Sequence, residues 1–290
     1  MNNKYYIWLS YLESIDIIKL NLLLKEFKTV ENLYNVEDIS DIKIYIDSKI
    51  ISKKDGEMIV DKDFKKKIDM ICEKLNKEGI YNINYTEKEY PEILKNIYDY
   101  PISIYAKGNI ELLNCNNKIA IIGSRDYTEY GKNACEYFTS KLAKKMIIVS
   151  GLARGIDSIA HRKTLESKGL TIGVLGNGLD YIYPPENKKL EDEIINKNGL
   201  IITEYPIGRR PSKYTFPLRN RIISGISDKL LIVEAKKRSG TLITAEFALE
   251  QGKEIYCIPG NINDKNFEGT NNLIKEGAIL VNTIEDIIDN

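Results

Sequence analysis

Small residues and single arginines follow two apolar runs in this chain, and residues of these types can bind an anion. The run Ile119–Ile122 is followed by Gly123-Ser124-Arg125, and the run Met146–Val149 by Ser150-Gly151 and then Arg154. An apolar run that stops in a small-residue turn and opens a helix is typical of a buried parallel strand. Backbone amides at a helix start bind phosphate, and a guanidinium adds a bidentate contact. The spacing therefore predicts a site for a phosphate-bearing partner.

The arginines are confined to one part of the chain. Of the 42 lysines and arginines, eight are arginines, and none precedes residue 125. Because the chain otherwise uses lysine for positive charge, the clustering indicates positions that need a planar, bidentate donor. Chance clustering is the alternative. The eight arginines are residues 125, 154, 162, 209, 210, 219, 221 and 238.

The most basic and aromatic stretch runs from Arg209 to Arg221 and leads into an expected helix near residues 218–225. Arg219 and Arg221 are then expected in the first helical turn, where cations oppose the helix dipole unless an anion binds between them. Phe216, beside Lys213 and Arg219, fits a platform on which a nucleic-acid base stacks within a cationic groove. The alternative is that Phe216 belongs to the core and the arginines form a solvated face.

Two further turns end expected strands. Lys236–Thr241 contains Arg238, Ser239 and Gly240 and repeats the order of strand, basic turn and helix. Ser239 or Thr241 is also suited to cap that helix, and a cap is compatible with a phosphate contact. The glycines of Leu175–Gly178 allow either a close backbone approach or simply a tight turn.

Candidate catalytic groups are few. His161 is the only histidine and is expected in mid-helix, where a structural role is the commoner one. Glu204, Glu234 and Glu246 lie at or near the expected ligand edge, but the sequence does not show two of them converging on a substrate. The glycine after Gly123 comes only at residue 131, so the dinucleotide fingerprint is absent. The residues therefore indicate no catalytic residue and no cofactor.

The elements that would hold these residues alternate from residue 118 onward. Such alternation predicts an α/β, Rossmann-like, mostly parallel sheet with helices on both faces, with ligands outside the carboxyl ends of the strands. Strands are expected near 119–122, 146–149, 171–175, 200–203, 229–234, 255–258 and 278–281, and helices near 130–144, 156–168, 187–197, 218–225, 241–251 and 269–276.

The first part of the chain has helical periodicity instead, in the segments 6–12, 17–27, 30–34 and 64–78. Pro91 and Pro101 then interrupt the chain on either side of a short apolar run, and residues 102–106 are expected to form a strand. We predict a small all-helical N-terminal domain over residues 1–88 and an extended Rossmann-like domain over residues 89–290. A helix-hairpin-helix module would need a glycine-flanked hairpin between helices, and the first domain has none in its sequence.

Composition bounds the remaining classes. The chain has 290 residues, 43% of them hydrophobic and 29% charged. Its net charge is zero, so it is not a protein that binds polyanions through its overall charge. The four cysteines are scattered without paired spacing, which argues against a zinc or other metal site and against a disulfide framework. Neither a membrane span nor a signal peptide is evident, so we expect a cytoplasmic protein with no membrane partner.

In their order, the motifs resemble the DNA-processing protein A (DprA/Smf) family of bacteria. The resemblance runs from about Tyr90 to Asp286, and the order of the segments makes it specific. The matching segments are Tyr90-Pro91 with Leu94-Lys95, 105–109, 121–125, 150–157 with Ala160-His161, Phe216-Pro217, 219–225, Glu234-Ala235, Ser239-Gly240 with Thr244-Ala245, Pro259-Gly260 and 269–271.

The resemblance implies a protein that binds single-stranded DNA, usually as a homodimer, and helps load a RecA-type recombinase during natural transformation. The family often has lysine at the position of Arg238, and the helical N-terminal segment matches only loosely. Many members continue into a winged-helix domain, which we do not expect after Ile287, so contact with double-stranded DNA stays open. Carried over by position, the family's DNA pocket falls on Arg125, Lys213, Phe216, Arg219, Arg221, Arg238 and Ser239.

Two other functions are compatible with parts of the pattern. One is a nucleotide-hydrolysing enzyme similar to the phosphoribohydrolases of the lysine-decarboxylase-like type, because Ser239-Gly240-Thr241 resembles part of their glycine-rich turn. In those enzymes a glutamate lies three residues after the threonine, whereas this chain has Thr244 there and its acid only at Glu246. The other is an interaction scaffold in which contact with DNA is incidental.

Overall fold

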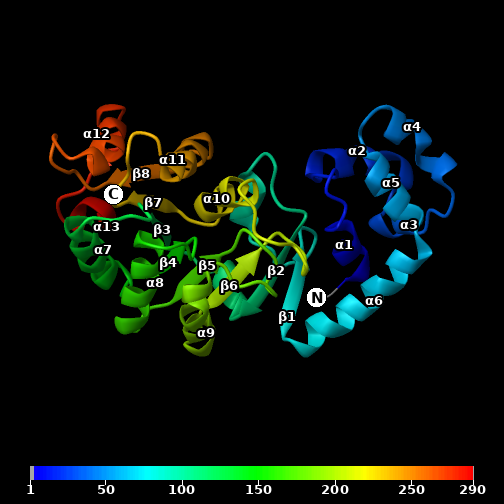
Figure 1. The fold of residues 1–290 in the computed structure, drawn as a ribbon, viewed down its shortest axis with the longest axis horizontal. Helices are drawn as coiled ribbons and strands as arrows, with labels where there is room; N and C mark the ends of the chain where they lie inside the picture. Colours follow the sequence, from blue (N-terminus) through cyan, green and yellow to red (C-terminus); the bar gives the residue numbers. More distant parts are fainter. Residues whose placement is uncertain (1–2, 290) are drawn as a thin grey trace.

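The computed structural model describes residues 3–289 and places nine strands in one sheet within them (Figure 1). Their order across the sheet is β1-β2-β6-β5-β4-β3-β7-β8-β9. The strands are β1 (Ile80–Asn84), β2 (Ser103–Gly108), β3 (Lys118–Ile122), β4 (Ile147–Ser150), β5 (Thr171–Val174), β6 (Leu200–Thr203), β7 (Lys229–Ile232), β8 (Glu254–Cys257) and β9 (Ile279–Leu280).

Parallel pairing dominates the sheet. β2 runs antiparallel to both β1 and β6, and every other neighbouring pair is parallel. All five residues of β3 are buried, as expected for a strand covered on both faces. Ile119 and Ile121 pack in one apolar cluster, whereas Ala120 and Ile122 pack in another on the opposite face. The predicted α/β architecture with helices on both faces is confirmed.

Helices α7 and α8 contribute to the first of these clusters, and α10 and α11 to the second. In the second half of the chain the helices are α7 (Glu129–Leu142), α8 (Ile156–Glu166), α9 (Lys188–Asn196), α10 (Thr215–Gly225), α11 (Gly240–Glu250), α12 (Glu268–Lys275) and α13 (Glu285–Ile288). Short 3-10 helices occupy 92–96, 110–113, 185–187 and 265–267. None of the helices within residues 3–289 is long and apolar enough to cross a membrane.

Six helices precede the sheet and lie together at one end of the molecule, opposite α12 and α13 (Figure 1). Side-chain caps start several of them: Asp16 Oδ1, for example, accepts from the Lys19 amide at 2.8 Å. They are α1 (Lys4–Leu9), α2 (Ile17–Phe27), α3 (Val30–Tyr34), α4 (Lys43–Asp47), α5 (Lys53–Val60) and α6 (Lys62–Lys77), with a 3-10 turn at 39–42.

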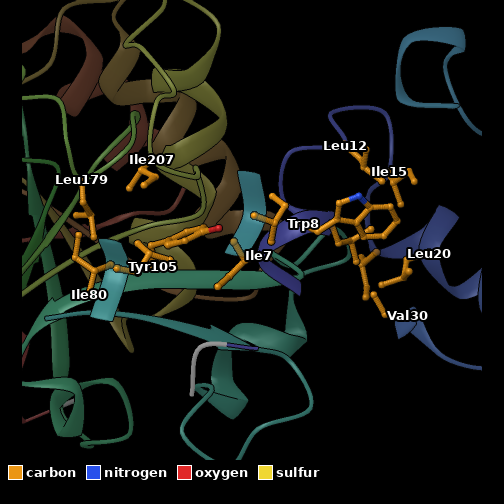
Figure 2. Close-up of a cluster of buried hydrophobic side chains, with 14 of the residues drawn as sticks. Ile7, Trp8, Leu12, Ile15, Leu20, Val30, Ile80, Tyr105, Leu179 and Ile207 are labelled. Atoms are coloured by element: carbon orange, nitrogen blue, oxygen red, sulfur yellow. The ribbon is translucent and has the colours of Figure 1, made fainter. Parts of the chain in front are cut away.

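One buried cluster joins these helices to the sheet. Figure 2 shows Ile7 of α1 between Trp8 on the helical side and Tyr105 and Ile80 on the strand side. The hydroxyl oxygens of Ser10 and Tyr105 lie 2.7 Å apart, and the Tyr11 hydroxyl donates to the Ile207 carbonyl at 2.9 Å. The turn after α1 is therefore fixed against the sheet.

The sequence analysis missed strand β1, which lies inside the segment predicted to be helical. Its asparagines disfavour a strand assignment, because asparagine is depleted in strands. The structure buries Asn82 instead and lets its side-chain amide donate to Ser103 Oγ on β2 at 3.0 Å. The domain boundary near residue 88 stays a prediction, and β1 before it belongs to the sheet.

Candidate nucleic-acid interface

The candidate site lies at the place in the sheet where the order of adding strands changes direction. From β3 the chain adds β4, β5 and β6 on one side, whereas β7 pairs with the other side of β3 and continues to β8 and β9. In open parallel sheets the crevice outside such a switch point is where ligands bind. The turns after β3 and β7 line a pocket of about 430 Å³ at this place, which we call the carboxyl-edge pocket.

The carboxyl-edge pocket brings together residues from Ile122 to Thr244, and they come from the turn after β3, the first turns of α10 and the segment that leads into α11. Most of the residues predicted to bind DNA are among those that line it. They are Gly123, Ser124, Arg125, Lys213, Phe216, Arg219, Ser239 and Gly240.

Glycines allow the two turns nearest β3 to approach closely. A Cβ atom on Gly123 would lie 2.7 Å from Cγ1 of Ile156, at the start of α8. Gly155 has a φ of +79°, and a Cβ there would lie 2.3 Å from the Ser124 carbonyl oxygen. The Ile156 amide donates to that same carbonyl at 3.1 Å. The turn that carries Arg125 is therefore packed against the start of α8.

Phe216 lies in the first turn of α10 and contacts a cation and a second ring. The Arg125 guanidinium lies 5.8 Å from the centre of the Phe216 ring. The Tyr183 ring is 5.2 Å from it, with 33° between the planes. A Cβ on Gly176 would come within 2.9 Å of the Phe216 ring, so that glycine leaves room for it. The half-buried Phe216 ring is thus positioned rather than mobile at the pocket wall.

Arg219 forms the floor of the pocket and is only 4% exposed. Its Nη1 donates to the carbonyls of Gly151 and Val174, at the ends of β4 and β5. Burial lowers the pKa of Arg219 to about 10, which still leaves the guanidinium charged at neutral pH. Burial likewise raises the pKa of Asp157, and the positive charge of Arg219 partly offsets that shift.

The start of α11 faces the same pocket. Ser239 occupies the N-cap position, but its side chain makes no capping hydrogen bond, and its buried Oγ has no hydrogen-bond partner among the described residues. Thr241 does not cap the helix either, since its Oγ1 donates to the Gly123 carbonyl at 3.2 Å. The first amides of α11 and the Ser239 hydroxyl therefore remain available to an anion.

Positive charge is in excess around the carboxyl-edge pocket. Four basic residues, Arg125, Lys213, Arg219 and Lys236, line it against two acidic ones, Asp126 and Asp157. Arg125 and Lys213 are exposed. A chain with zero net charge thus presents a locally cationic surface at the sheet edge.

Four predicted site residues do not line this pocket. Gly151 lies directly below it as the acceptor of the Arg219 hydrogen bond, and the exposed Arg154 forms an ion pair with Glu186. Arg238 is exposed on the turn before α11. Arg221 lies on another face of α10, where its Nε contacts Asp99 at 3.0 Å and its Nη2 contacts Glu204 at 2.6 Å.

The expectation that Arg219 and Arg221 lie in the first turn of α10 was wrong. The helix begins at Thr215, three residues earlier than expected, so both arginines fall in its second turn. Residues two apart on a helix point in different directions, which is why Arg219 faces the strand ends and Arg221 does not.

Sequence reasoning also missed several residues of the pocket. Lys236 belongs to the basic turn after β7 but was not singled out, and Asp157 closes the motif that starts at Ser150. Asn220 lies within the motif around Arg219. No sequence signal points to Tyr183, because only the fold brings it against Phe216.

The candidate catalytic groups are used elsewhere. Glu204 pairs with Arg221, and Glu234 Oε2 accepts from the Thr128 amide at the start of α7. Glu246 is exposed on α11, and none of the three glutamates lines the carboxyl-edge pocket. His161 is buried in α8 with its Nδ1 2.7 Å from Thr171 Oγ1. Within residues 3–289, no cluster of His, Cys, Asp or Glu is arranged to hold a metal ion.

A doubly wound α/β sheet whose switch-point crevice combines guanidinium groups, an aromatic ring and helix-start amides defines a Rossmann-like protein with a crevice suited to a phosphate-bearing ligand. The sequence profile described as DNA recombination-mediator protein A matches residues 82–290. The chain is 41% identical over 227 residues to the DNA processing protein DprA of Bacillus subtilis. The aligned residues cover 78% of this chain and 76% of that protein. This chain therefore belongs to the DNA recombination-mediator protein A (DprA/Smf) family.

Two solved structures are similar as well. The DNA processing protein A of Streptococcus pneumoniae superposes with a TM-score of 0.79 at 35% identity, covering 99% of this chain and 98% of that one. The second is the DNA processing protein A of Helicobacter pylori, whose structure was described for its single-stranded DNA binding mode. It superposes with a TM-score of 0.66 at 33% identity, over 72% of this chain and 94% of that one.

Proposed function

We propose that this protein binds single-stranded DNA at the carboxyl-edge pocket and helps to load a RecA-type recombinase onto it during natural transformation. The observation that carries the proposal is the contact of the half-exposed Phe216 ring with the Arg125 guanidinium and the Tyr183 ring, in the wall of a cationic crevice. A ring of this kind stacks one base, while cations beside it hold the phosphates. The related Helicobacter pylori protein is described as binding single-stranded DNA.

Each group has a separate role in this proposal. Arg125 and Lys213 are exposed and contact phosphates of the strand, whereas the buried Arg219 holds the turn after β4 and supplies positive potential from below. The amides at the start of α11 and the Ser239 hydroxyl bind a further phosphate oxygen. Arg238 contributes from outside the pocket wall.

The same proposal includes the oligomeric state of the protein, its place in the cell and the absence of an enzymatic activity. We expect a cytoplasmic homodimer that acts as a recombination mediator and not as an enzyme, as the family membership supports. A nucleotide-hydrolysing enzyme of the phosphoribohydrolase type would need the glutamate of its glycine-rich turn at the pocket, and Glu246, the glutamate nearest that turn, is exposed outside it. Incubation with nucleoside monophosphates tests this directly: release of free base that is lost in Glu246→Gln would establish the enzyme instead.

The test of DNA binding is a salt series with oligo-dT. We expect Phe216→Ala to weaken binding by about 1–3 kcal/mol at every salt concentration, because a stacked base is lost but no phosphate contact. Arg125→Ala should also make the slope of log K against log[salt] shallower by about 0.7, as one neutralised phosphate is lost. Phe216→Leu keeps an apolar side chain without a ring and separates stacking from packing.

The matched control for charge is Arg162→Ala, since Arg162 is exposed on α8 and does not line the pocket. Unchanged affinity in both Phe216→Ala and Arg125→Ala would refute the assignment of the pocket to DNA. Light scattering, and a strand-exchange reaction with a RecA-type recombinase, then test the dimer and the loading step separately.

A further inference from the structure

A second pocket, of about 650 Å³, lies on the other side of α10. Its walls are the turn between α1 and α2, the segments 99–103 and 204–209, and the face of α10 that carries Leu218 and Arg221. Leu12, Ile15 and Ile207, which belong to the cluster shown in Figure 2, also line it. We call it the junction pocket, because it lies between the N-terminal helices and the sheet. Its size is within the range of small-molecule sites.

The ion pair in its wall leaves one donor and one acceptor unused. Arg221 is 7% exposed, and its Nε and Nη2 are occupied by Asp99 and Glu204. Among the described residues, the buried Nη1 of Arg221 has no hydrogen-bond acceptor, and the buried Oε1 of Glu204 has no hydrogen-bond donor. A buried polar atom without a partner is costly, so a ligand that satisfies both gains binding energy there.

The charge of the junction pocket excludes a phosphate. Four acidic residues line it, Glu13, Asp16, Asp99 and Glu204, against two arginines, Arg209 and Arg221. Both arginines are already paired, Arg209 with Glu13 at 2.5 Å. The ligand is therefore expected to be neutral, with an acceptor for Arg221 Nη1 next to a donor for Glu204 Oε1.

The mouth of the pocket suits a flat ring. Tyr214 lies just before α10 and Leu218 lies in its first turn. Both residues line the pocket, and they are 70% and 50% exposed. An exposed tyrosine ring beside an apolar side chain offers a stacking face. Arginine and glutamate side chains are among those that read the edge of a nucleobase, and enzymes that extrude a base hold it by such hydrogen bonds together with stacking.

A short basic segment connects the two pockets. Arg209 lines the junction pocket and Lys213 lines the carboxyl-edge pocket, and between them Arg210 is exposed with its guanidinium 5.9 Å from the centre of the Tyr181 ring. Phosphates can lie along this segment while a base enters the acidic pocket beside it.

We propose that the junction pocket is a nucleobase site, in which Arg221 Nη1 donates to the base, Glu204 Oε1 accepts from it and Tyr214 stacks on it. The base comes either from the strand held in the carboxyl-edge pocket or from a free nucleoside. The first source rests on the proposed function, whereas the second does not.

The test uses Leu218→Trp, which fills the mouth of the pocket and keeps Arg221 and Glu204 in the chain. Leu22→Trp is the matched control, because Leu22 lies on α2, is 40% exposed and does not line either pocket. Calorimetry with each of the four 2′-deoxynucleosides should show binding of at least one to the wild-type protein and to Leu22→Trp. Leu218→Trp should weaken it by about 5- to 150-fold, the range for loss of one stacked base.

A second arm asks whether the strand supplies the base. Oligo-dT carrying a single 2-aminopurine at successive positions should show one register whose fluorescence on binding differs between wild type and Leu218→Trp. A different register should respond to Phe216→Ala. Nucleoside binding without any Leu218-dependent register would identify the free nucleoside as the source and leave the site assignment intact.

Three results separate this proposal from the proposed function. If no nucleoside binds and no register depends on Leu218, the nucleobase site is refuted even when oligo-dT binds normally. Leu218-dependent binding of spermidine without any nucleoside would refute it too, in favour of a cation site. If oligo-dT fails to bind but a nucleoside binds in a Leu218-dependent manner, the proposed function fails and the nucleobase site stands.

Discussion

The two pockets beside α10 use arginine in opposite ways. In the carboxyl-edge pocket, four basic residues face two acidic ones, and no ion pair within residues 3–289 involves Arg125. In the junction pocket, two arginines face four acidic residues, and both are paired. The comparison teaches that nearby carboxylates decide whether an arginine at the sheet edge is held in an ion pair or left outside one. Variants that change one side of α10 at a time test this contrast.

The largest expected effect is on the paired side. Arg221→Ala removes the partner of Glu204 and Asp99 and leaves Glu204, which is 16% exposed in its side chain, uncompensated. Removal of one partner of a buried pair costs about 3–5 kcal/mol, so urea unfolding should show that loss of stability. Arg125→Ala, on the unpaired side, should change the free energy of unfolding by less than about 0.5 kcal/mol. A comparable loss in both variants would erase the distinction between the pockets.

A smaller effect is expected below the carboxyl-edge pocket at Gly151. A Cβ there would lie 2.6 Å from Arg219 Nη1 and 2.7 Å from Asp157 Oδ2, so Gly151→Ala must displace the buried guanidinium. Overpacking of this kind costs about 1–3 kcal/mol in the free energy of unfolding. Gly240→Ala is the matched control, because nothing lies within 4 Å of a Cβ there. Equal stability of the two variants would show that Arg219 is not held as tightly as its contacts indicate.

The charge of the carboxyl-edge pocket also bears on His161, which lies fully buried beneath it. Burial, opposed by a hydrogen bond with the Ser150 backbone and assisted by the positive charge of Arg219, lowers the pKa of His161 to about 3. An unfolded histidine titrates near pH 6.5, so between these values the unfolded state binds more protons and stability falls as the pH falls. From about pH 7 to about pH 5.5 the loss should be about 1 kcal/mol.

The measurement is urea unfolding of wild type and His161→Gln at both pH values. The variant lacks the titrating imidazole, so its stability should change less over this interval by about 1 kcal/mol. The same pH dependence in both proteins would mean that the imidazole is not held neutral under Arg219.

The sequence was sufficient for the parallel sheet and for most of the carboxyl-edge pocket, because both depend on short motifs at strand ends. Gly123 and Arg125 lie in the turn directly after β3, whereas Ser239 and Gly240 lie where the longer segment after β7 leads into α11. Parallel strands bring such connections to one edge. Phe216, which its basic neighbours singled out in the sequence, lines the pocket as well, and its role as a stacking platform stays a prediction.

The remainder depends on contacts between distant segments that no local pattern encodes. The partners of Arg221, Asp99 and Glu204, lie 122 and 17 positions away, so its neutralisation is not apparent from its own motif. Arg221 comes two residues after Arg219 in α10 and therefore points in another direction, although both belong to the same motif. Strand β1 is stabilised by pairing with β2 rather than by its own propensity.

The smallest expected effect sharpens the comparison at Arg238, which the family resemblance assigns to DNA. Its side chain is exposed and does not line the carboxyl-edge pocket, so it attracts a phosphate through solvent, where salt screens the interaction. Arg238→Ala should weaken oligo-dT binding by about twofold and change the salt slope by clearly less than the roughly 0.7 expected for Arg125→Ala. Fluorescence anisotropy over a salt series measures both variants together. A slope change equal to that of Arg125→Ala would show that the bound strand extends over the turn before α11, and the boundary of the cationic surface would then lie beyond the pocket wall.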